Sequence, residues 1–184
     1  ELIKILQVRN IDSFVESRRQ KTSEKDKKTV QSILNDVRKN GDSAVKKYER
    51  KFNGRKTSQL RVSAKEIKEA RSKISSEEIT ALRDMSACLR PRGNRKVKPW
   101  SYSNFVFMKF VPIPSVGCYI PGGQARYPSS VVMSVQTARK AGVKRIVVVS
   151  PPGPDGKIDP LTIVAAKMCG ATEIYKVGGA QAIG

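Results

Sequence analysis

From Phe105 onward the sequence alternates between short segments with strand patterns and longer segments with helix patterns, and this alternation restricts the fold more than any other feature. The strand patterns cover 105–111, 116–120, 145–150 and 173–177, and the helix patterns cover 129–141 and 160–169. Short, regular connections of this kind imply right-handed crossovers and a parallel sheet with helices on both faces. We therefore predict an α/β fold with a Rossmann-like βαβαβ parallel sheet that is incomplete at the C-terminus.

The residues before this region are mostly helical in pattern. Ser23, Ser63 and Ser75 each precede an acidic residue by three positions, which is the spacing of a capping box. Apolar residues follow each serine at helical spacing, and only 60–62 reads as a short strand between the helices. The sequence thus predicts a mainly helical N-terminal region over 1–104.

A further helix is expected between Asp42 and Gly54. The Asp42 side chain can cap its N-terminus, and a glycine commonly ends a helix. Val45, Tyr48 and Phe52 fall on one side of this helix, so we expect these three side chains to face the core.

Residues 90–104 (RPRGNRKVKPWSYSN) interrupt both patterns. They contain proline, glycine and five basic side chains without apolar periodicity, which predicts a basic linker before an α/β segment at 105–184. Trp100 and Tyr102 lie beside the basic run. Aromatic side chains in this setting either stack on nucleic-acid bases or anchor a loop on the core, and the second role is the more common.

The balance of charges is strongly basic. The chain has 36 Lys and Arg residues against 16 Asp and Glu residues, which gives a net charge of +20. Such a surface favours binding to polyanions through counterion release. The basic residues are also interleaved with acidic ones, as on the solvated faces of amphipathic helices, and the interleaving favours this second interpretation.

Composition excludes several classes of protein. No apolar run approaches the roughly 18 residues that a bilayer crossing needs, so we expect a cytoplasmic protein with no membrane segment. Cys88, Cys118 and Cys169 are far apart, which excludes a disulfide framework and a zinc knuckle. The surroundings of Cys118 and Cys169 are those of core residues rather than nucleophiles. The sequence has no histidine, so Ser-His pairs, Cys-His pairs and histidine metal ligands are excluded within it.

Two glycine-rich loops follow predicted strands: Pro121-Gly-Gly after 116–120 and Gly178-Gly after 173–177. In parallel sheets, ligands bind outside the carboxyl ends of the strands, where these loops lie. Glycine lets a ligand approach the main chain, and a helix N-terminus behind the first loop favours an anion such as a cofactor phosphate. An ordinary tight turn is the more common meaning of Pro-Gly-Gly, and neither loop matches the G-x-G-x-x-G dinucleotide fingerprint.

Four motifs in the second half of the chain resemble the histidinol dehydrogenase family. They are VGCYIPGG from Val116, YPSSVVM from Tyr127, AGVKRIVVVSPP from Ala141 and YKVGGAQAI from Tyr175. The helical region adds DVRKNGD from Asp36 and YERKFNG from Tyr48. The segment at 86–104 does not resemble the family pattern well. Four motifs in the family's order make the resemblance specific.

The resemblance implies a zinc-requiring, NAD-dependent oxidoreductase of histidine biosynthesis, which oxidises L-histidinol to L-histidine in two steps through L-histidinaldehyde. It also implies a homodimer with the active site between Rossmann-like domains. In the family, the tyrosine of Tyr-Ile-Pro-Gly-Gly and the glutamine of Gly-Gly-Ala-Gln contact NAD, and these are Tyr119 and Gln181 in this chain. A hydroxyl and an amide at neighbouring strand ends can reach one ligand over the sheet edge. A core tyrosine and a helix-capping glutamine are the structural alternatives.

The chain departs from the family in length and in its catalytic residues. Family members are more than twice as long, and their zinc ligands and the Glu-His pair for proton transfer lie in a part without counterpart here. Asp155, Asp159 and Glu173 look like loop, cap and strand-edge residues, whereas a zinc site needs about three protein ligands. We therefore expect the chain alone to be inactive, and a second copy or a missing catalytic half to be its partner. An unfinished sheet would offer that partner an unpaired edge and an uncovered face.

Two other functions compete with this hypothesis. A basic binding module would keep the scaffold and use its charge for RNA or another polyanion. A non-functional remnant is the third interpretation, favoured if the irregular linker prevents folding. The enzyme hypothesis predicts an NAD-induced change at Tyr119, whereas the binding module predicts retention on a polyanion with a steep dependence on salt.

Overall fold

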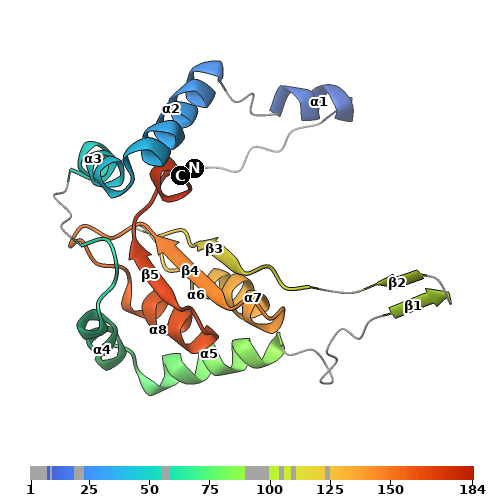
Figure 1. Ribbon diagram of the computed structural model, residues 1–184, viewed down its shortest axis with the longest axis vertical. Coiled ribbons are helices and arrows are strands. Elements are labelled where there is room, and N and C mark those ends of the chain that lie inside the picture. Colours follow the sequence, from blue (N-terminus) through green and yellow to red (C-terminus); the bar gives the residue numbers. More distant parts are fainter. Residues whose placement is uncertain are drawn as a thin grey trace.

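The computed structural model describes residues 8, 10–18, 23–54, 59–89, 100–103, 106–108, 111–122 and 125–184. In chain order its elements are α1 (Ile11–Arg18), α2 (Glu24–Asn40), α3 (Asp42–Asn53), α4 (Ala64–Ser72), α5 (Ser76–Cys88), β1 (Trp100–Ser103), β2 (Val106–Met108), β3 (Ser115–Tyr119), α6 (Pro128–Val131), η1 (Val132–Gln136), α7 (Thr137–Lys140), β4 (Arg145–Ser150), α8 (Pro160–Cys169), β5 (Glu173–Lys176) and η2 (Ala180–Ala182). Here η1 is a π-helical turn that joins α6 to α7, and η2 is a short 3-10 helix. Parallel strands with their connecting helices confirm the predicted α/β class (Figure 1).

The central sheet has three parallel strands in the order β3-β4-β5. Each lies within one residue of the position predicted from the sequence. The register aligns Tyr119 with Val149, and Val149 with Tyr175. Because side chains alternate along a strand and aligned residues of parallel strands point the same way, these three side chains share one face of the sheet.

The outer edge of β5 is paired as well. Arg61 and Tyr175 form an antiparallel bridge, and the backbone N–H of Val62 donates to the Ile174 carbonyl at 2.8 Å. The segment predicted as a short strand at 60–62 thus forms an isolated bridge that covers part of the β5 edge, and the unpaired edge expected of an unfinished sheet stays a prediction.

β1 and β2 pair antiparallel, away from the central sheet (Figure 1). β2 lies within the strand predicted at 105–111. β1 takes up the end of the segment 90–104, which we expected to be a linker throughout. That expectation is wrong for Trp100–Ser103, because an antiparallel partner supplies hydrogen bonds that a loop would leave to solvent. Residues 90–99 lie outside the described part of the chain.

The helices that connect the three parallel strands lie on one face of the sheet. Figure 1 shows α6, α7 and α8 together behind β3, β4 and β5, and α6 and α8 contact each other. Along β4, Ile146 and Val148 are buried, whereas Val147 and Val149 on the other face are only half-buried. On that other face, Val149 and Tyr175 pack against the apolar cluster of α2 and α3. Helices therefore lie against both faces as expected, although the helices that connect the strands lie on one face only. Right-handed crossovers between strands added in one direction place their helices on the same face.

The core lies between the sheet and these helices and continues into a further layer. Val131 and Val148 are fully buried, and α4 and α5 pack against α8. Ala70 on α4 and Leu82 on α5 belong to the same core cluster. The core therefore extends across both predicted regions, 1–104 and 105–184, and the boundary between them stays a prediction.

Serine caps begin the helices as the sequence predicted. Ser63 and Ser75 each form a reciprocal capping box, with Glu66 and Glu78 respectively. The Ser23 side chain likewise accepts hydrogen bonds from backbone N–H groups in the first turn of α2. α3 differs, because Asp42 lies inside the helix and its N-cap position is held by Gly41, without a side-chain hydrogen bond.

A second apolar cluster joins α2 and α3 to the end of the chain. Val37, Val45 and Tyr48 pack there with Val177, and both helices contact η2. Phe52, expected to face this core, is 51% exposed, whereas Glu49 is 0% exposed. In the described chain, no helix has both the length and the apolar character needed to cross a bilayer.

Candidate functional site

The loops that follow β3, β4 and β5 meet at the carboxyl edge of the sheet. A Cβ added at Gly122, after β3, would lie 2.7 Å from the Ser150 Oγ and 3.0 Å from the Pro151 carbonyl oxygen. Only a residue without a side chain allows this close approach. The next two residues, 123 and 124, lie outside the described chain, so the anion site predicted at Pro121-Gly-Gly stays a prediction.

Tyr119 lies at the end of β3 and contacts the loop after β5. Its hydroxyl oxygen accepts a hydrogen bond from the backbone N–H of Gly179 at 3.1 Å. The φ of Gly179 is +64°, in the region that favours glycine. The side chain of Tyr119 is 40% exposed, so it is not the core tyrosine that was the alternative.

Gln181 lies two residues beyond Gly179, in η2, and is 3% exposed. Its Nε2 donates to the Glu49 Oε1 at 2.9 Å, so its side chain joins η2 to α3 rather than capping a helix. Its Oε1 is buried and accepts no hydrogen bond from the described residues. The structure therefore places both predicted NAD contacts, Tyr119 and Gln181, around the same glycine loop.

A groove of about 420 Å³ lies next to these residues. Val149, Tyr175 and Gln181 line it, with residues of α2, α3 and the segment at 59–61. Since Tyr119 shares a sheet face with Val149 and Tyr175, the groove and the tyrosine lie on the face without connecting helices. Tyr119 itself is not among the lining residues, and the Tyr175 side chain and the Gln181 amide in the lining suit a small polar ligand.

Glu49 is the residue that sequence reasoning missed. Its carboxylate accepts hydrogen bonds from Gln181, from the backbone N–H of Gly178 at 3.3 Å and from Asn53 Nδ2 at 2.7 Å. A helix-period signal was available, because Glu49 lies four residues after Val45 and thus on the same side of α3. Charged residues are seldom assigned to a core, and the pattern was assigned to Phe52 instead.

The acidic residues considered for zinc have other partners. The Asp155 Oδ1 accepts from the Lys157 N–H at 3.0 Å, and the Asp159 Oδ2 caps α8 through the Thr162 N–H at 3.0 Å. Glu173 pairs with the Arg145 guanidinium on the neighbouring strand. These contacts confirm the expected loop, cap and strand-edge roles. Throughout the described ranges, no group of three His, Cys, Asp or Glu side chains could hold a metal ion.

Burial and ion pairing shift the pKa of several groups near the sheet. Hydrogen bonds from Arg145 and then from Tyr175 lower the pKa of Glu173 to about 2. Cys118 and Cys169 are buried, which confirms the prediction that they are core residues, and this burial raises the pKa of both thiols.

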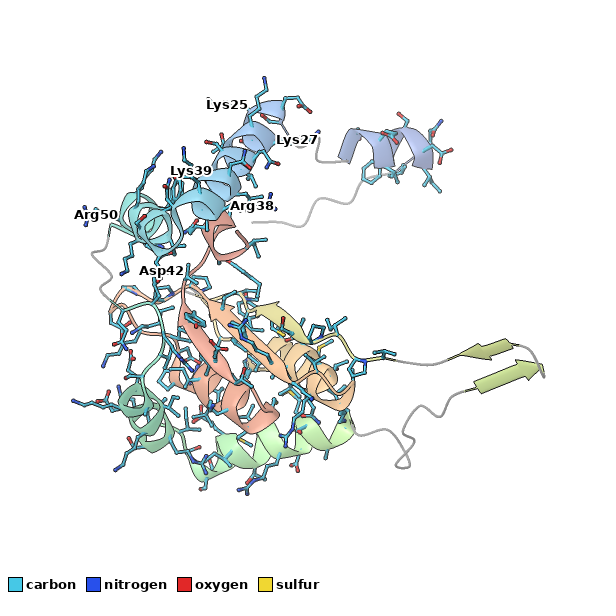
Figure 2. All side chains as sticks on the ribbon, in the orientation of Figure 1. Lys25, Lys27, Arg38, Lys39, Asp42 and Arg50 are labelled. Atoms are coloured by element: carbon cyan, nitrogen blue, oxygen red, sulfur yellow. The ribbon has the colours of Figure 1, made fainter. Side chains whose placement is uncertain are left out.

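The basic side chains of the N-terminal helices are largely solvated. Figure 2 shows Lys25, Lys27, Arg38, Lys39 and Arg50 on the exposed surfaces of α2 and α3. Some basic residues have acidic partners, as in the Lys27–Glu24 and Lys47–Asp36 pairs, both at 2.7 Å. The side chains of Trp100 and Tyr102, considered for base stacking, lie outside the described part. This arrangement supports the interpretation of the charge as solvated helix faces.

Comparisons with known proteins agree with these observations. Residues 16–184 match the family model for histidinol dehydrogenase. The histidinol dehydrogenases of Methanosarcina barkeri and Bacillus licheniformis are each 42% identical to the chain over 166 residues, covering 85% and 88% of it respectively. A crystal structure of histidinol dehydrogenase from Elizabethkingia anophelis matches with a TM-score of 0.78 and 29% identity, over 95% of this chain and 42% of that one.

The chain spans 38% and 39% of the lengths of the two sequence relatives. Within that span, the family's motifs occur in order and the fold is shared. The comparisons therefore do not favour the polyanion-binding alternative. The chain belongs to the histidinol dehydrogenase family.

Proposed function

We propose that this chain forms the NAD-binding part of an enzyme that oxidises L-histidinol to L-histidine through L-histidinaldehyde. The observation that carries the proposal is the hydrogen bond between Gly179 and Tyr119, which joins the ends of two strands at the carboxyl edge of a parallel sheet. Ligands of such sheets bind at this edge. Family membership supports the choice of NAD and of L-histidinol.

The residues at this edge fit a dinucleotide. Tyr119 offers a partly exposed ring and a hydroxyl, and glycines at 122 and 179 keep side chains away from the main chain. The Gln181 carbonyl oxygen is a buried acceptor without a donor among the described residues. An unpaired buried polar group costs about 1–3 kcal/mol, which a ligand donor would recover. When bound, NAD accepts a hydride in each oxidation.

The described residues do not fit zinc, because no suitable cluster of ligands is present among them. The sequence also lacks the histidine that could serve as proton carrier. Residues outside this sequence would therefore supply the metal site, the proton transfer and part of the L-histidinol site. Homodimerisation, which the resemblance implies, belongs to the same proposal. We expect the 184-residue chain on its own to be inactive with L-histidinol.

Thermal unfolding of the pure chain with and without millimolar NAD tests the cofactor site. A ligand that binds only the folded state raises the unfolding midpoint by mass action. We expect this rise in the wild type and its loss in Tyr119→Ala. Phe52→Ala is the control, since it removes an exposed aromatic ring from α3 and should keep the rise.

Two results would contradict the proposal. The first is cooperative unfolding of the wild type with a midpoint that NAD does not change. The second is turnover of L-histidinol above background by the pure, zinc-loaded chain, which would show that the catalytic groups are present in this sequence after all.

A further inference from the structure

Glu49 is a buried carboxylate in contact with the loop that carries the candidate NAD residues. It lies on α3, is 0% exposed and accepts three hydrogen bonds. Its Oε1 accepts from Gln181 Nε2 at 2.9 Å and from the Gly178 N–H at 3.3 Å, and its Oε2 accepts from Asn53 Nδ2 at 2.7 Å. Burying a carboxylate is unfavourable unless donors surround it. The three donors account for its burial.

These contacts determine which way the Gln181 amide points. The backbone N–H of Gly178 can only donate, so the Glu49 Oε1 that it contacts must act as a hydrogen-bond acceptor. The same oxygen faces Gln181, which must therefore present its NH₂ group. Its carbonyl oxygen then points away from Glu49, where it has no donor among the described residues.

Gly179 lies next to this carbonyl oxygen. A Cβ at Gly179 would be 2.8 Å from the Gln181 Oε1. The oxygen is covered in the present arrangement, so a ligand donor reaches it only when the loop shifts. Glycine has the backbone freedom that such a shift requires.

We propose that Glu49 is a positioning residue of the NAD site. It holds the Gln181 amide with the carbonyl oxygen free, and this oxygen accepts a hydrogen bond from an N–H or O–H group of the bound dinucleotide. The same carboxylate anchors the loop through Gly178. This inference rests on the proposed function, because it assigns a role to Glu49 within the NAD site.

Two conservative variants separate this role from a general effect of charge. Glu49→Gln keeps the length of the side chain and an oxygen for Gly178 and Gln181, while Asn53, which is exposed, can turn its amide to pair with the new NH₂ group. Glu49→Asp keeps the charge but is one methylene too short to reach Gln181. Positioning predicts that Gln is tolerated and Asp is not, whereas an electrostatic role predicts the reverse. Glu77→Gln, at an exposed site in the first turn of α5, is the control for loss of a carboxylate.

Two measurements on the 184-residue chain test the proposal. Hydrogen exchange of the Gln181 side-chain NH₂, assigned by its loss in Gln181→Met, should be slow in the wild type, Glu49→Gln and Glu77→Gln, and at least about tenfold faster in Glu49→Asp. The NAD dissociation constant should rise roughly tenfold in Glu49→Asp and change less than about twofold in the other two variants.

The outcomes distinguish this inference from the function on which it rests. Equal NAD affinity in the wild type and Glu49→Asp would overturn the role of Glu49 and leave the NAD site intact. The role of Glu49 would also be overturned if the hydrogen-exchange rate of the Gln181 side-chain NH₂ were the same in Glu49→Asp as in the wild type. Absence of NAD binding by the folded wild type would overturn both, even if the amide exchange follows the expected pattern.

Discussion

The backbone N–H of Gly179 donates a hydrogen bond to the hydroxyl oxygen of Tyr119 at 3.1 Å, and β4 lies between β3, which ends at Tyr119, and β5, which precedes Gly179. The bond therefore reaches across the carboxyl edge of the whole sheet. A molecule that displaces or supports the Tyr119 hydroxyl also acts on the loop that positions Gln181. This relationship makes the tyrosine a sensitive probe of ligand binding.

Tyr119→Phe should weaken NAD binding more than it weakens the fold. Phenylalanine keeps the ring but removes the acceptor of the Gly179 N–H, which is exposed and can bond to water instead. The free energy of unfolding in urea should fall by no more than about 1 kcal/mol, while the NAD dissociation constant rises roughly three- to tenfold.

The matched control for this variant is Tyr48→Phe. It removes a hydroxyl that hydrogen-bonds to Asp36, and Tyr48 is not among the residues that line the groove beside Gln181. Calorimetric titration should show unchanged NAD affinity in this control. Equal losses of affinity in the two variants would mean that the Tyr119 hydroxyl has no special role.

Gly179→Ala should destabilise the protein more than Gly41→Ala, because of these two positions only Gly179 would bring an added Cβ against another side chain. Gly54 has a φ of +67° and a ψ of 16°, in the left-handed helical region that alanine can adopt at modest cost, whereas Gly179 has a φ of +64° and a ψ of −167°, a conformation open essentially to glycine alone. Gly41→Ala is the closer control, because its φ of +53° and ψ of −136° are also unfavourable for alanine and its new Cβ would meet nothing within 4 Å. At Gly179 the Cβ would in addition meet the Gln181 amide, which Glu49 holds in place, so we expect Gly179→Ala to cost about 1–2 kcal/mol more than Gly41→Ala in urea unfolding. Equal losses would show that the Gln181 side chain moves aside freely.

The features that sequence reasoning predicted well are local ones. A serine followed by an acidic residue three positions later fixes a helix start, because both hydrogen bonds of the capping box lie within one turn. The boxes at Ser63 and Ser75 illustrate this. The parallel strands could be predicted from the sequence equally well, since a continuous apolar run between two helix patterns has few other interpretations. The family motifs then indicated Tyr119 and Gln181, whose role in binding NAD stays a prediction.

The features that were missed depend on contacts distant in sequence. Which helices cover each face depends on strand order and on the packing of α2 and α3 against Val149 and Tyr175, which a βαβαβ pattern does not contain. The burial of Glu49 depends on donors more than a hundred residues away, at Gly178 and Gln181. β1 depends on its partner β2, because the sequence around Trp100 has no apolar periodicity of its own.

One of the three thiols should react much faster than the others. Cys88 is exposed, whereas Cys118 and Cys169 are buried in the core. Burial raises the pKa of both buried thiols and also blocks access of the reagent. With an aromatic disulfide reagent at neutral pH we expect a rapid phase that Cys88→Ser abolishes, and a slow phase that follows unfolding. Three equally fast thiols would show that this core does not form in solution.

The ion pair between Arg145 and Glu173 should make the free energy of unfolding depend on pH in the acidic range. The Arg145 Nε lies 2.7 Å from the Glu173 Oε1, and hydrogen bonds from Arg145 and then Tyr175 lower the carboxyl pKa from 4.5 to about 2. A carboxyl group with a lower pKa in the folded state stabilises the fold fully above its unfolded pKa, and this stabilisation is lost as the pH falls through the folded value. Glu173→Gln removes it at every pH.

The difference in unfolding free energy between the wild type and Glu173→Gln should therefore be constant above about pH 5 and shrink as the pH falls from about 4.5 toward 2. Urea unfolding at stepped pH measures it, and the difference is the proper quantity because the net charge of +20 affects both proteins alike. Added salt should reduce it at neutral pH, since the Arg145 side chain is 58% exposed. Glu77→Gln, at an exposed position, is the control, and a similar pH-dependent difference there would show that general charge repulsion, rather than the pair across β4 and β5, sets the acid response.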